Sequence, residues 1–360
     1  MIGLAPIRVA IVAPCFGTLG GIETFVCAIA KELHAQPGFE VTLCFKKTKN
    51  FELDWLLERT ACDTGAEVVF VERGSQELAG AIRRADIVHC QNPCFDVAVL
   101  TKLFGKALIL TMHNQRHRNL HPREVARWLA WNMADRRWYN SEFNWNIWDP
   151  RRKKPNSARF HVLLHLPSGI IPPAERRGFV FVARWIANKG IDTLVEAYAR
   201  AKLDRRKWPL ILMGDGPLRP MIETRIREEK IEGVEILGFV SEEKRNEVIR
   251  HARWMVTPPN TKEDLGVTPI EARHVAVPCI ITRDGGLPEA GGQHALICEP
   301  GNVEELKQLL EKAAAMDMEA YEHLCKATHR ELLDYLSPLS AYMDHCKQLI
   351  GRKSEPAARY

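Results

Sequence analysis

Short apolar runs rich in β-branched residues alternate with amphipathic stretches along most of the chain, and this alternation limits the possible folds more than any other feature. Strands buried on both faces are apolar throughout, and the helices that connect parallel strands cover both faces of a sheet. We therefore expect an α/β fold with parallel sheets. In the first half, strands are expected at 8–14, 40–45, 67–71, 86–90, 107–113 and 161–166, with helices at 21–35, 76–84 and 122–134.

A proline-rich segment interrupts this alternation near the middle of the chain. Residues 166–173 contain three prolines and one glycine, a composition typical of a linker. The alternation then restarts, with strands expected at 178–184, 210–214, 234–239, 254–257 and 278–282. We predict two doubly wound, Rossmann-like domains, over 1–172 and 173–335, that face one another across a cleft at the carboxyl ends of their strands. After residue 317 the chain is expected to be helical to about 351, with the helix at 336–351 packing back on the first domain.

The composition is typical of a globular protein, and the cysteine usage leads us to expect that it works in the cytoplasm. Charged residues make up 26% and hydrophobic residues 46% of the chain, and no apolar window reaches the ~18 residues that a membrane-spanning helix needs. The first residues lack the basic start and cleavage pattern of a signal peptide. The ten cysteines are scattered, and the closest pair, Cys90 and Cys94, has no second pair to complete a metal site. We expect these thiols to be small buried side chains in a reducing compartment.

The segment from Glu263 to Glu271 carries the clearest chemical signal. Two carboxylates lie eight positions apart, on either side of a glycine and of an expected helix start that Pro269 favours. The amides of Gly266, Val267 and Thr268 would point at an anion, helped by the helix dipole. Carboxylates accept hydrogen bonds from sugar hydroxyls, so this segment suits a diphosphate flanked by a sugar and a ribose.

The same segment resembles the Glu-x7-Glu motif of the retaining glycosyltransferases of family four, which have the GT-B fold. The family pattern is close to E-x-F-G-x-x-x-x-E-A, and this chain has E-D-L-G-V-T-P-I-E-A, with Leu265 at the common phenylalanine position. Further matches stand in the expected order at 182–190, 213–217, 238–240, 284–289 and 299–301. The resemblance covers about residues 178–315 and is limited in the first half to 20–23 and 111–113.

The resemblance implies a role for particular residues. Four are expected to take part in catalysis: His113 against the transferred sugar, Arg184 and Lys189 on the diphosphate, and Glu263 on the donor sugar. The expected donor-binding set comprises Gly20, Gly21, Arg184, Lys189, Gly214, Phe239, Val240, Glu263, Gly266, Val267, Thr268 and Glu271. Within it, Phe239 and Val240 would line the nucleobase with their backbone, and Glu271 would hold the ribose.

The implied reaction transfers a hexose from a nucleoside-diphosphate sugar with retention at the anomeric carbon. The diphosphate gains negative charge as it leaves, and preorganised cations and helix amides stabilise such charge. The chain has no D-x-D sequence, so we expect no metal and no cofactor, and activity that survives chelation. A covalent route through Glu263 stays open, although the family favours proton transfer to the leaving phosphate. The Thr268–Pro269 pair slightly favours a mannose-type sugar.

A basic, tryptophan-rich segment lies in the first half. Residues 116–154 hold ten Lys or Arg against four Asp or Glu, and five of the nine tryptophans of the chain. Such a mixture suits an anionic membrane surface or a lipid-linked acceptor, which would place the protein at the inner face of the membrane. The alternative is that the tryptophans belong to the core, since Trp128 and Trp131 have helical spacing. Glycan and small-molecule acceptors are also compatible.

Three other classes of function fit the sequence less well. Two Rossmann-like domains also describe oxidoreductases, but the first turn is G-T-L-G-G and the second strand ends in Lys46 and Lys47, which could suit only an NADP phosphate. A non-catalytic glycan-binding paralogue is a second alternative, against which the retained charged set of the donor site argues. No nucleic-acid partner is expected, because the isoelectric point near 8.6 is modest and no recognition module is present.

Overall fold

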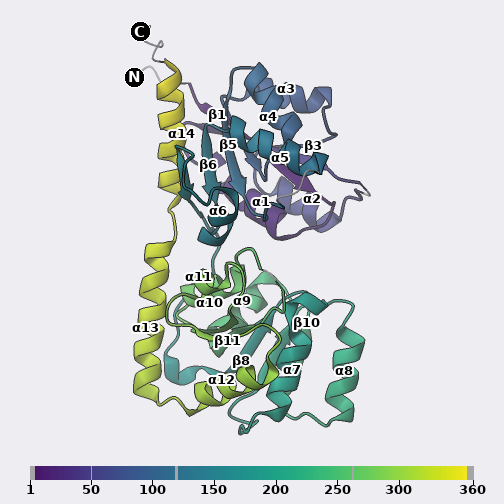
Figure 1. Ribbon diagram of the computed structural model, residues 1–360, viewed down its shortest axis with the longest axis vertical. Helices are drawn as coiled ribbons and strands as arrows, with labels where there is room; N and C mark the ends of the chain where they lie inside the picture. The colour runs from purple at the N-terminus through teal and green to yellow at the C-terminus, as the bar shows by residue number, and fades with distance from the viewer. Residues whose placement is uncertain (1–4, 50, 118–120, 262, 355–360) are drawn as a thin grey trace. The chain divides into compact units, whose positions relative to one another are not determined.

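The structure is a computed structural model that describes residues 5–49, 51–117, 121–261 and 263–354 (Figure 1). Its internal contacts divide the chain into two units. The first runs to His165 and also includes the chain from Leu336 onward, and the second spans Leu166–Tyr335. The division thus falls a little before residue 172, where the linker was expected, and each unit has its own parallel sheet.

The first unit contains a seven-stranded parallel sheet in the order β3-β2-β1-β4-β5-β6-β7. Its strands are β1 (Ile7–Cys15), β2 (Phe39–Lys47), β3 (Glu67–Val71), β4 (Ile87–Gln91), β5 (Ala107–Met112), β6 (Arg136–Tyr139) and β7 (Ser157–Arg159). Its helices are α1 (Gly21–His34), α2 (Trp55–Cys62), α3 (Gln76–Arg84), α4 (Phe95–Leu103), α5 (Pro122–Met133), α6 (Glu142–Trp148) and α14 (Leu339–Ser354). The order reverses on the two sides of β1, as in a doubly wound sheet.

Two strands of this sheet differ from the sequence expectation. The segment 161–166 is not a strand, and β7 lies just before it at Ser157–Arg159. The sequence also gave no sign of β6, because that strand begins with two arginines. Arg137 is nevertheless buried, since its guanidinium donates to the carbonyl oxygens of Trp131 and Asn132 at 2.9 and 3.0 Å. A buried arginine with satisfied donors interrupts the apolar pattern of a strand, so the strand is not recognised from hydrophobicity.

The second unit contains a six-stranded parallel sheet in the order β10-β9-β8-β11-β12-β13. Its strands are β8 (Arg177–Val182), β9 (Leu210–Met213), β10 (Val234–Gly238), β11 (Ala252–Thr257), β12 (Cys279–Thr282) and β13 (Leu296–Cys298), of which β13 was not expected. Its helices are α7 (Ile191–Arg200), α8 (Arg219–Glu228), α9 (Glu242–His251), α10 (Val267–His274), α11 (Leu287–Gly291), α12 (Val303–Ala315) and α13 (Met318–Tyr335), with short 3₁₀ turns η1 (Pro173–Glu175) and η2 (Ala187–Lys189).

The C-terminal helical region is broken rather than continuous. Helix α13 ends at Tyr335 in the second unit and α14 starts at Leu339 in the first. Pro338 lies in the break, where a helix interior would lose a hydrogen bond and meet a steric clash. In the first unit, α14 adds Tyr342, Cys346 and Leu349 to the core beneath β1 and β5. Among the residues that the structure describes, no helix is both long enough and apolar enough to cross a membrane.

Most of the tryptophans between 116 and 154 belong to the core of the first unit. Trp131, Trp138 and Trp148 are buried, and Trp145 stacks on Tyr139 with ring centroids 5.3 Å apart. Trp128, on α5, is 40% exposed. The clustering of tryptophan in this segment therefore reflects packing at four positions, and of the five only Trp128 offers a broad exposed face. Residues 118–120 lie outside the described part of the chain.

Candidate active site

The turn after β8 carries the two basic residues of the expected diphosphate site. Arg184 is exposed just past the strand, and Lys189 ends the 3₁₀ turn η2. Gly190 follows with φ of 70°, and a Cβ there would lie 1.8 Å from the carbonyl oxygen of Pro258. Only glycine fits such a position. The chain can therefore pass directly from the basic turn into α7.

The next two strands end in the residues expected near the base. Gly214 has φ of 107°, and its amide donates to the carbonyl oxygen of Gly238 at 2.7 Å. A Cβ on Gly214 would approach the backbone oxygen of Ala183 to 1.9 Å, so the turns after β8 and β9 pack tightly together. Phe239 is 79% exposed directly after β10, followed by the partly buried Val240. An exposed aromatic ring at a strand end is a suitable surface for a planar ligand.

The loop before α10 brings two predicted residues into contact. Lys189 Nζ lies 2.5 Å from Glu263 Oε2, and both side chains are 23% exposed. The Glu263 backbone is fixed as well, because its carbonyl oxygen accepts from the Gly286 amide at 2.8 Å. An ammonium and a carboxylate are thus held together at the edge of the sheet, 74 positions apart in sequence.

Helix α10 begins as the sequence predicted. Gly266 is its N-cap with φ of 88° and offers no side chain to the first amides. Val267 is 43% exposed, and Thr268 Oγ1 lies 3.4 Å from Thr257 Oγ1. The helix N-terminus therefore has positive backbone charge without a capping side chain, which is the arrangement that favours a bound anion.

Glu271 is deeply buried one turn further along α10. The residue is 7% exposed, and its Oε1 lies 3.1 Å from a guanidinium nitrogen of Arg245 on α9. Its Oε2 is buried with no hydrogen-bond partner in the described part of the chain. Burial raises the pKa of Glu271, and the Arg245 charge opposes this shift. A buried acceptor without a donor suits a ligand hydroxyl. The sequence motif did not indicate Arg245.

In the first unit, the turn after β1 presents two exposed glycines. Gly20 is the N-cap of α1 and Gly21 its first residue. A Cβ on Gly21 would meet nothing within 4 Å, whereas one on Gly20 would lie 2.9 Å from a carboxylate oxygen of Glu23. Glu23 is 5% exposed, and burial raises its pKa. Another chain or ligand can therefore approach the backbone here closely.

His113 follows β5, and neighbouring side chains fix its position. Its amide donates to Asn92 Oδ1 at 2.9 Å, and its carbonyl oxygen accepts from Asn144 Nδ2 at 3.0 Å. The ring packs edge-on against Phe25, with centroids 5.2 Å apart. Burial lowers the pKa of His113 to about 4, so the imidazole is neutral at pH 7.

A chain of buried hydrogen bonds sets the tautomer of His113. His113 Nε2 lies 2.8 Å from Gln91 Oε1, Gln91 Nε2 lies 3.1 Å from His89 Nε2, and His89 Nδ1 lies 3.0 Å from the Tyr342 hydroxyl. The Gln91 amide nitrogen can only donate, and it contacts His89 Nε2, so the amide oxygen is the atom that faces His113. An amide oxygen can only accept, and His113 must therefore donate from Nε2. Nδ1 becomes the acceptor nitrogen of the His113 ring. Sequence analysis missed Gln91, His89 and Tyr342, although the first two alternate with buried apolar residues in β4.

Comparison with known proteins adds independent information to this geometry. Residues 170–330 match the family model described as glycosyl transferases group 1, and residues 19–147 match the one described as glycosyltransferase family 4. The chain is a GT-B glycosyltransferase. These two matches cover most of both units.

Individual relatives agree with this assignment. The glycosyltransferase is 23% identical to the alpha-D-kanosaminyltransferase of Streptomyces kanamyceticus over 277 residues, which is 68% of this chain and 72% of the relative. It is 29% identical to the O-antigen chain mannosyltransferase B of Escherichia coli over 133 residues, covering 35% and 34% of the two chains. Among solved structures it is similar to Anabaena HepE in complex with UDP and glucose, with a TM-score of 0.75, 13% identity and coverage of 95% and 99%.

The oxidoreductase hypothesis is set aside by these matches, and the structure adds a local reason. Lys46 Nζ lies 2.6 Å from Asp96 Oδ1, and Lys47 Nζ lies 3.2 Å from Glu72 Oε1. The two lysines that could have received an NADP phosphate are therefore already paired with carboxylates. Their positive charge is largely neutralised within the first unit of the glycosyltransferase.

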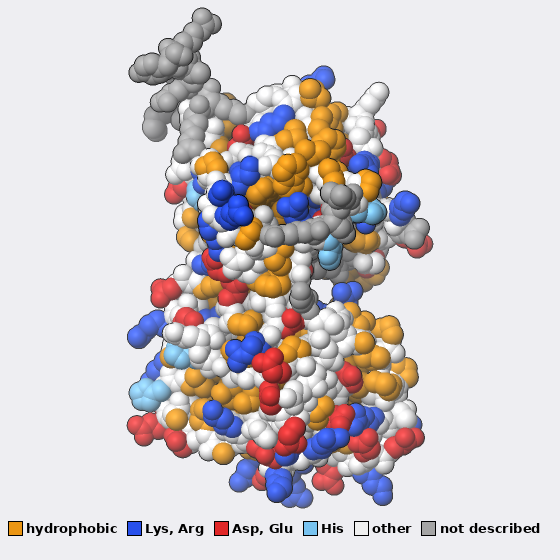
Figure 2. Space-filling model, in the orientation of Figure 1, with side chains coloured by type: hydrophobic (Ala, Val, Ile, Leu, Met, Phe, Trp, Pro, Cys, Tyr) orange, Lys and Arg blue, Asp and Glu red, His pale blue; other side chains and the backbone are white. Residues whose placement is uncertain are grey.

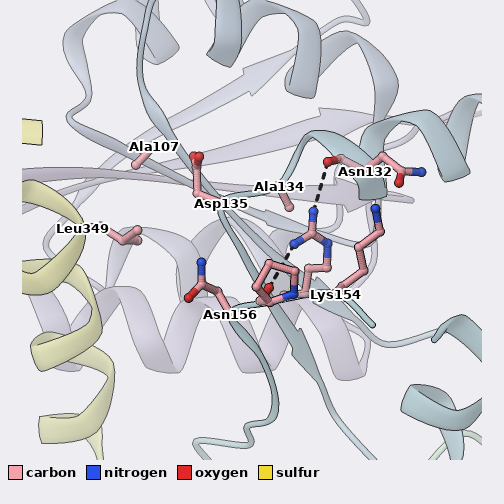
Figure 3. A pocket seen from close by; sticks show the side chains of 9 residues that line it. Ala107, Asn132, Ala134, Asp135, Lys154, Asn156 and Leu349 are labelled. Carbon is pink, nitrogen blue, oxygen red and sulfur yellow. Dashed lines mark hydrogen bonds between the residues drawn. The ribbon is translucent and has the colours of Figure 1, made fainter. Parts of the chain in front are cut away.

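A pocket of about 450 Å³ lies at the opposite, amino edge of the first sheet (Figure 3). Figure 3 shows Ala107, Asp135 and Asn156 at the starts of neighbouring strands, with Leu349 of α14 facing them. Asp135 Oδ2 accepts from the Leu108 amide at 2.7 Å and pairs with Lys102 at the same distance. The Asp135 carboxylate thus connects β5 to α4. Because this lining side chain holds neighbouring elements together, we assign the pocket a structural role in the glycosyltransferase.

Proposed function

We propose that this glycosyltransferase transfers a hexose from a nucleoside-diphosphate sugar, with retention and without a metal ion, to a glycan, lipid-linked or small-molecule acceptor. The observation that carries the proposal is the Lys189–Glu263 contact of 2.5 Å at the edge of the second sheet. It supports a site at which one cation and one carboxylate serve the diphosphate and the sugar of a single donor. Nucleotide binding by the similar Anabaena protein, solved with UDP and glucose, is consistent with this.

The donor is proposed to lie along the carboxyl edge of the second sheet. Arg184, Lys189 and the first amides of α10 would hold the diphosphate, because positive charge and free amides favour an anion. The backbone at Phe239 and Val240 would line the base. The partnerless Oε2 of Glu271 would accept from the ribose, which satisfies a buried acceptor. A mannose-type sugar is slightly favoured by Thr268–Pro269 and by the O-antigen mannosyltransferase relative.

The reaction is proposed to depend on electrostatic stabilisation of the leaving diphosphate. As the glycosidic bond breaks, Arg184 and Lys189 would take up the developing negative charge, and the leaving phosphate would accept the proton of the acceptor. Lys189 also neutralises Glu263 at 2.5 Å. A carboxylate held by an ammonium is a weaker nucleophile, so the contact favours Glu263 as a ligand of the sugar hydroxyls over a covalent route. His113, neutral at pH 7, would contact the transferred sugar.

Nucleotide binding tests the donor site. Thermal shift and calorimetry with UDP, GDP, ADP and their common sugar conjugates, in buffer without metal, should show selective stabilisation by one nucleoside diphosphate. Glu271→Gln and Arg184→Ala should weaken that binding at least about tenfold, the scale of one lost charged hydrogen bond. Glu235→Gln, on the exposed side of β10, is the matched control. Equal affinity in all variants would place the donor elsewhere.

Turnover distinguishes an enzyme from a glycan-binding paralogue and tests the metal question. Donor hydrolysis or transfer should continue in excess chelator, because side chains and helix amides replace a metal. Lys189→Met should lower turnover by about a hundredfold, the usual effect of removing one preorganised charge stabiliser. Activity that disappears with chelator and returns with magnesium would refute the metal-independent mechanism.

A membrane contact is proposed for the outer face of α5. Val125, Trp128 and Leu129 are each about 40% exposed on one helical face, beside the exposed Arg123. On the side of the first unit that Figure 2 shows, hydrophobic and basic side chains are intermixed. Apolar and basic side chains together favour an anionic bilayer surface. This would bring the enzyme to the inner face of the membrane, near a lipid-linked acceptor.

Liposome flotation tests this contact. Vesicles that contain anionic phosphatidylglycerol should carry the protein upward, and neutral phosphatidylcholine vesicles should carry less. Trp128→Ser should reduce flotation, whereas Trp55→Ser, at another exposed tryptophan, should not. Protein that stays wholly in the soluble fraction with both vesicles would remove the membrane proposal and leave the donor proposal intact.

A further inference from the structure

Two large aromatic side chains are exposed at the carboxyl edge of the first sheet, the edge that binds ligands in doubly wound folds. Phe16 directly follows β1 and is 66% exposed. Trp55 is the first residue of α2, in the connection after β2, and is 67% exposed. Among the residues that the structure describes, the apolar cores of the first unit include neither ring. Neighbouring exposed apolar side chains mark a surface for another molecule.

The backbone between the two rings is fixed, so that they project from one rigid part of the edge. The carbonyl oxygen of Gly17 accepts from the Asp54 amide at 2.8 Å. This hydrogen bond joins the residue that follows Phe16 to the residue that precedes Trp55. A Cβ on Gly17, whose φ is 96°, would lie 1.9 Å from the carbonyl oxygen of Glu52. Because only glycine allows so close an approach, the two connections are locked together before any ligand binds.

The strand order places this pair of rings beside the point where the sheet reverses. β1 lies between β2 and β4, and ligands of doubly wound sheets bind in the crevice at such a reversal. Phe95, the first residue of α4 after β4, is 37% exposed. β2 and β5 are three strand spacings apart, about 14 Å, and His113 follows β5. The edge from Trp55 to His113 is therefore longer than a single sugar ring.

The connections that form this part of the edge carry no excess of positive charge. Residues 16–20, after β1, include no charged side chain, and residues 48–54, after β2, contain Lys49 against Glu52 and Asp54. The two lysines that end β2 are paired with carboxylates at 2.6 and 3.2 Å. Recognition of a phosphate group depends on charged donors that are free to bind it. Exposed rings on an edge without surplus cations suit a neutral ligand instead.

We propose that Phe16 and Trp55 bind the acceptor, and that the acceptor is a neutral saccharide of more than one sugar whose rings stack on these side chains. The C–H groups on the face of a sugar ring are apolar and weakly positive, and they fit the negative face of an aromatic ring. This inference rests on the proposed hexose transfer and names its acceptor. The reacting hydroxyl oxygen of the saccharide bonds to the anomeric carbon, the bond from that carbon to the diphosphate breaks, and the hydroxyl proton goes to the leaving diphosphate.

Binding of oligosaccharides to the full-length protein tests the aromatic pair directly. Saturation-transfer NMR with a panel of neutral trisaccharides of the common hexoses and N-acetylhexosamines should identify at least one that binds. Farnesyl phosphate, an isoprenyl phosphate without sugars, should bind more weakly. Phe16→Ser and Trp55→Ser should each lower the affinity for the bound trisaccharide about fivefold, the effect of one lost aromatic contact. Phe16→Tyr and Trp55→Phe, which keep a ring, should stay within about twofold of the wild type.

Transfer kinetics separate the acceptor site from the donor site. In Trp55→Ser, the KM for the trisaccharide should rise about fivefold, whereas the KM for the donor and the rate of donor hydrolysis should not change. Leu103→Ser, at an exposed apolar side chain on the far end of α4, is the matched control. Nucleotide binding without saccharide binding would remove this inference alone. Saccharide binding without nucleotide binding would refute the proposed donor site and leave the saccharide site intact.

Two results would overturn the proposal. If the trisaccharide binds the wild type and both serine variants with equal affinity, the acceptor lies elsewhere. If no saccharide of the panel binds, or farnesyl phosphate binds more tightly than any of them, the acceptor is not a neutral saccharide. Both side chains are largely exposed, so the serine variants should fold, and an unchanged melting temperature checks this.

Discussion

Two buried histidines of the first unit, His89 and His161, should make this unit lose stability as the pH falls below about 6.5. They are 1% and 3% exposed, and burial lowers the pKa of each to about 3. The unfolded chain therefore binds protons between pH 6.5 and 3 that the folded chain does not bind. Because the folded-state pKa is depressed, stability is complete above the unfolded pKa and decreases as the pH falls.

The size of the effect follows from these values. Each buried histidine lowers the free energy of unfolding by about 2 kcal/mol between pH 8 and pH 5, so the pair accounts for about 4 kcal/mol. This is a large share of the roughly 5–15 kcal/mol that stabilises a typical domain. His113, whose pKa burial lowers to about 4, shifts in the same direction and adds to the loss. Glu23, whose pKa is raised by burial, opposes the loss.

His161→Phe is the most direct perturbation. Both ring nitrogens of His161 are buried without a hydrogen-bond partner in the described structure, and the ring stacks on Phe25 at 6.0 Å, so phenylalanine can replace it. Urea titrations read by hydrogen exchange in β4 and β5 report the first unit alone. The loss between pH 8 and 5 should shrink by about 2 kcal/mol in this variant. His165→Asn is the control, because this exposed histidine has φ of 59°, which asparagine tolerates. An undiminished loss in His161→Phe would refute the argument.

Three further substitutions give separate tests. Gly190→Ala should destabilise the second unit by about 2–3 kcal/mol, through left-handed strain and the contact with Pro258, measured by urea unfolding. Arg273→Met should cost about 3 kcal/mol by the same measurement, because it removes a 1%-exposed guanidinium from its ion pair. Gln91→Leu should lower kcat about tenfold with little change in KM for the donor, since His113 loses the acceptor that orients it. Unchanged stability of Gly190→Ala or Arg273→Met, or an unchanged kcat of Gln91→Leu, would contradict the corresponding prediction.

The sequence predicted the parts of the fold that depend on apolar periodicity. The α/β class, ten of the thirteen described strands in position or nearly so, and the start of α10 all follow from runs of buried residues and helix-start signals. It failed where polar residues are buried or where an element is very short. The buried Arg137 interrupts the apolar pattern of β6, and β13, with three residues, is too short to show a periodic pattern.

The candidate site was predicted unevenly for a similar reason. Residues within a local motif, such as Glu263 and Gly266, can be recognised from their spacing. Partners from other elements cannot, because nothing near them in sequence records the contact. Arg245 reaches Glu271 from α9, and Tyr342 reaches His89 across 253 positions. The tautomer of His113 thus depends on a residue that no motif near His113 contains.

The crossing of the chain from α13 to α14 has a consequence during synthesis. The core beneath β1 and β5 needs Tyr342, Cys346 and Leu349, which the ribosome adds long after the strands that they cover. The second unit, by contrast, has all its strands and helices once Tyr335 has emerged. The first unit is therefore translated first but completed last. Until α14 has been made, the apolar core beneath β1 and β5 stays uncovered, and chaperones would have to protect it from aggregation.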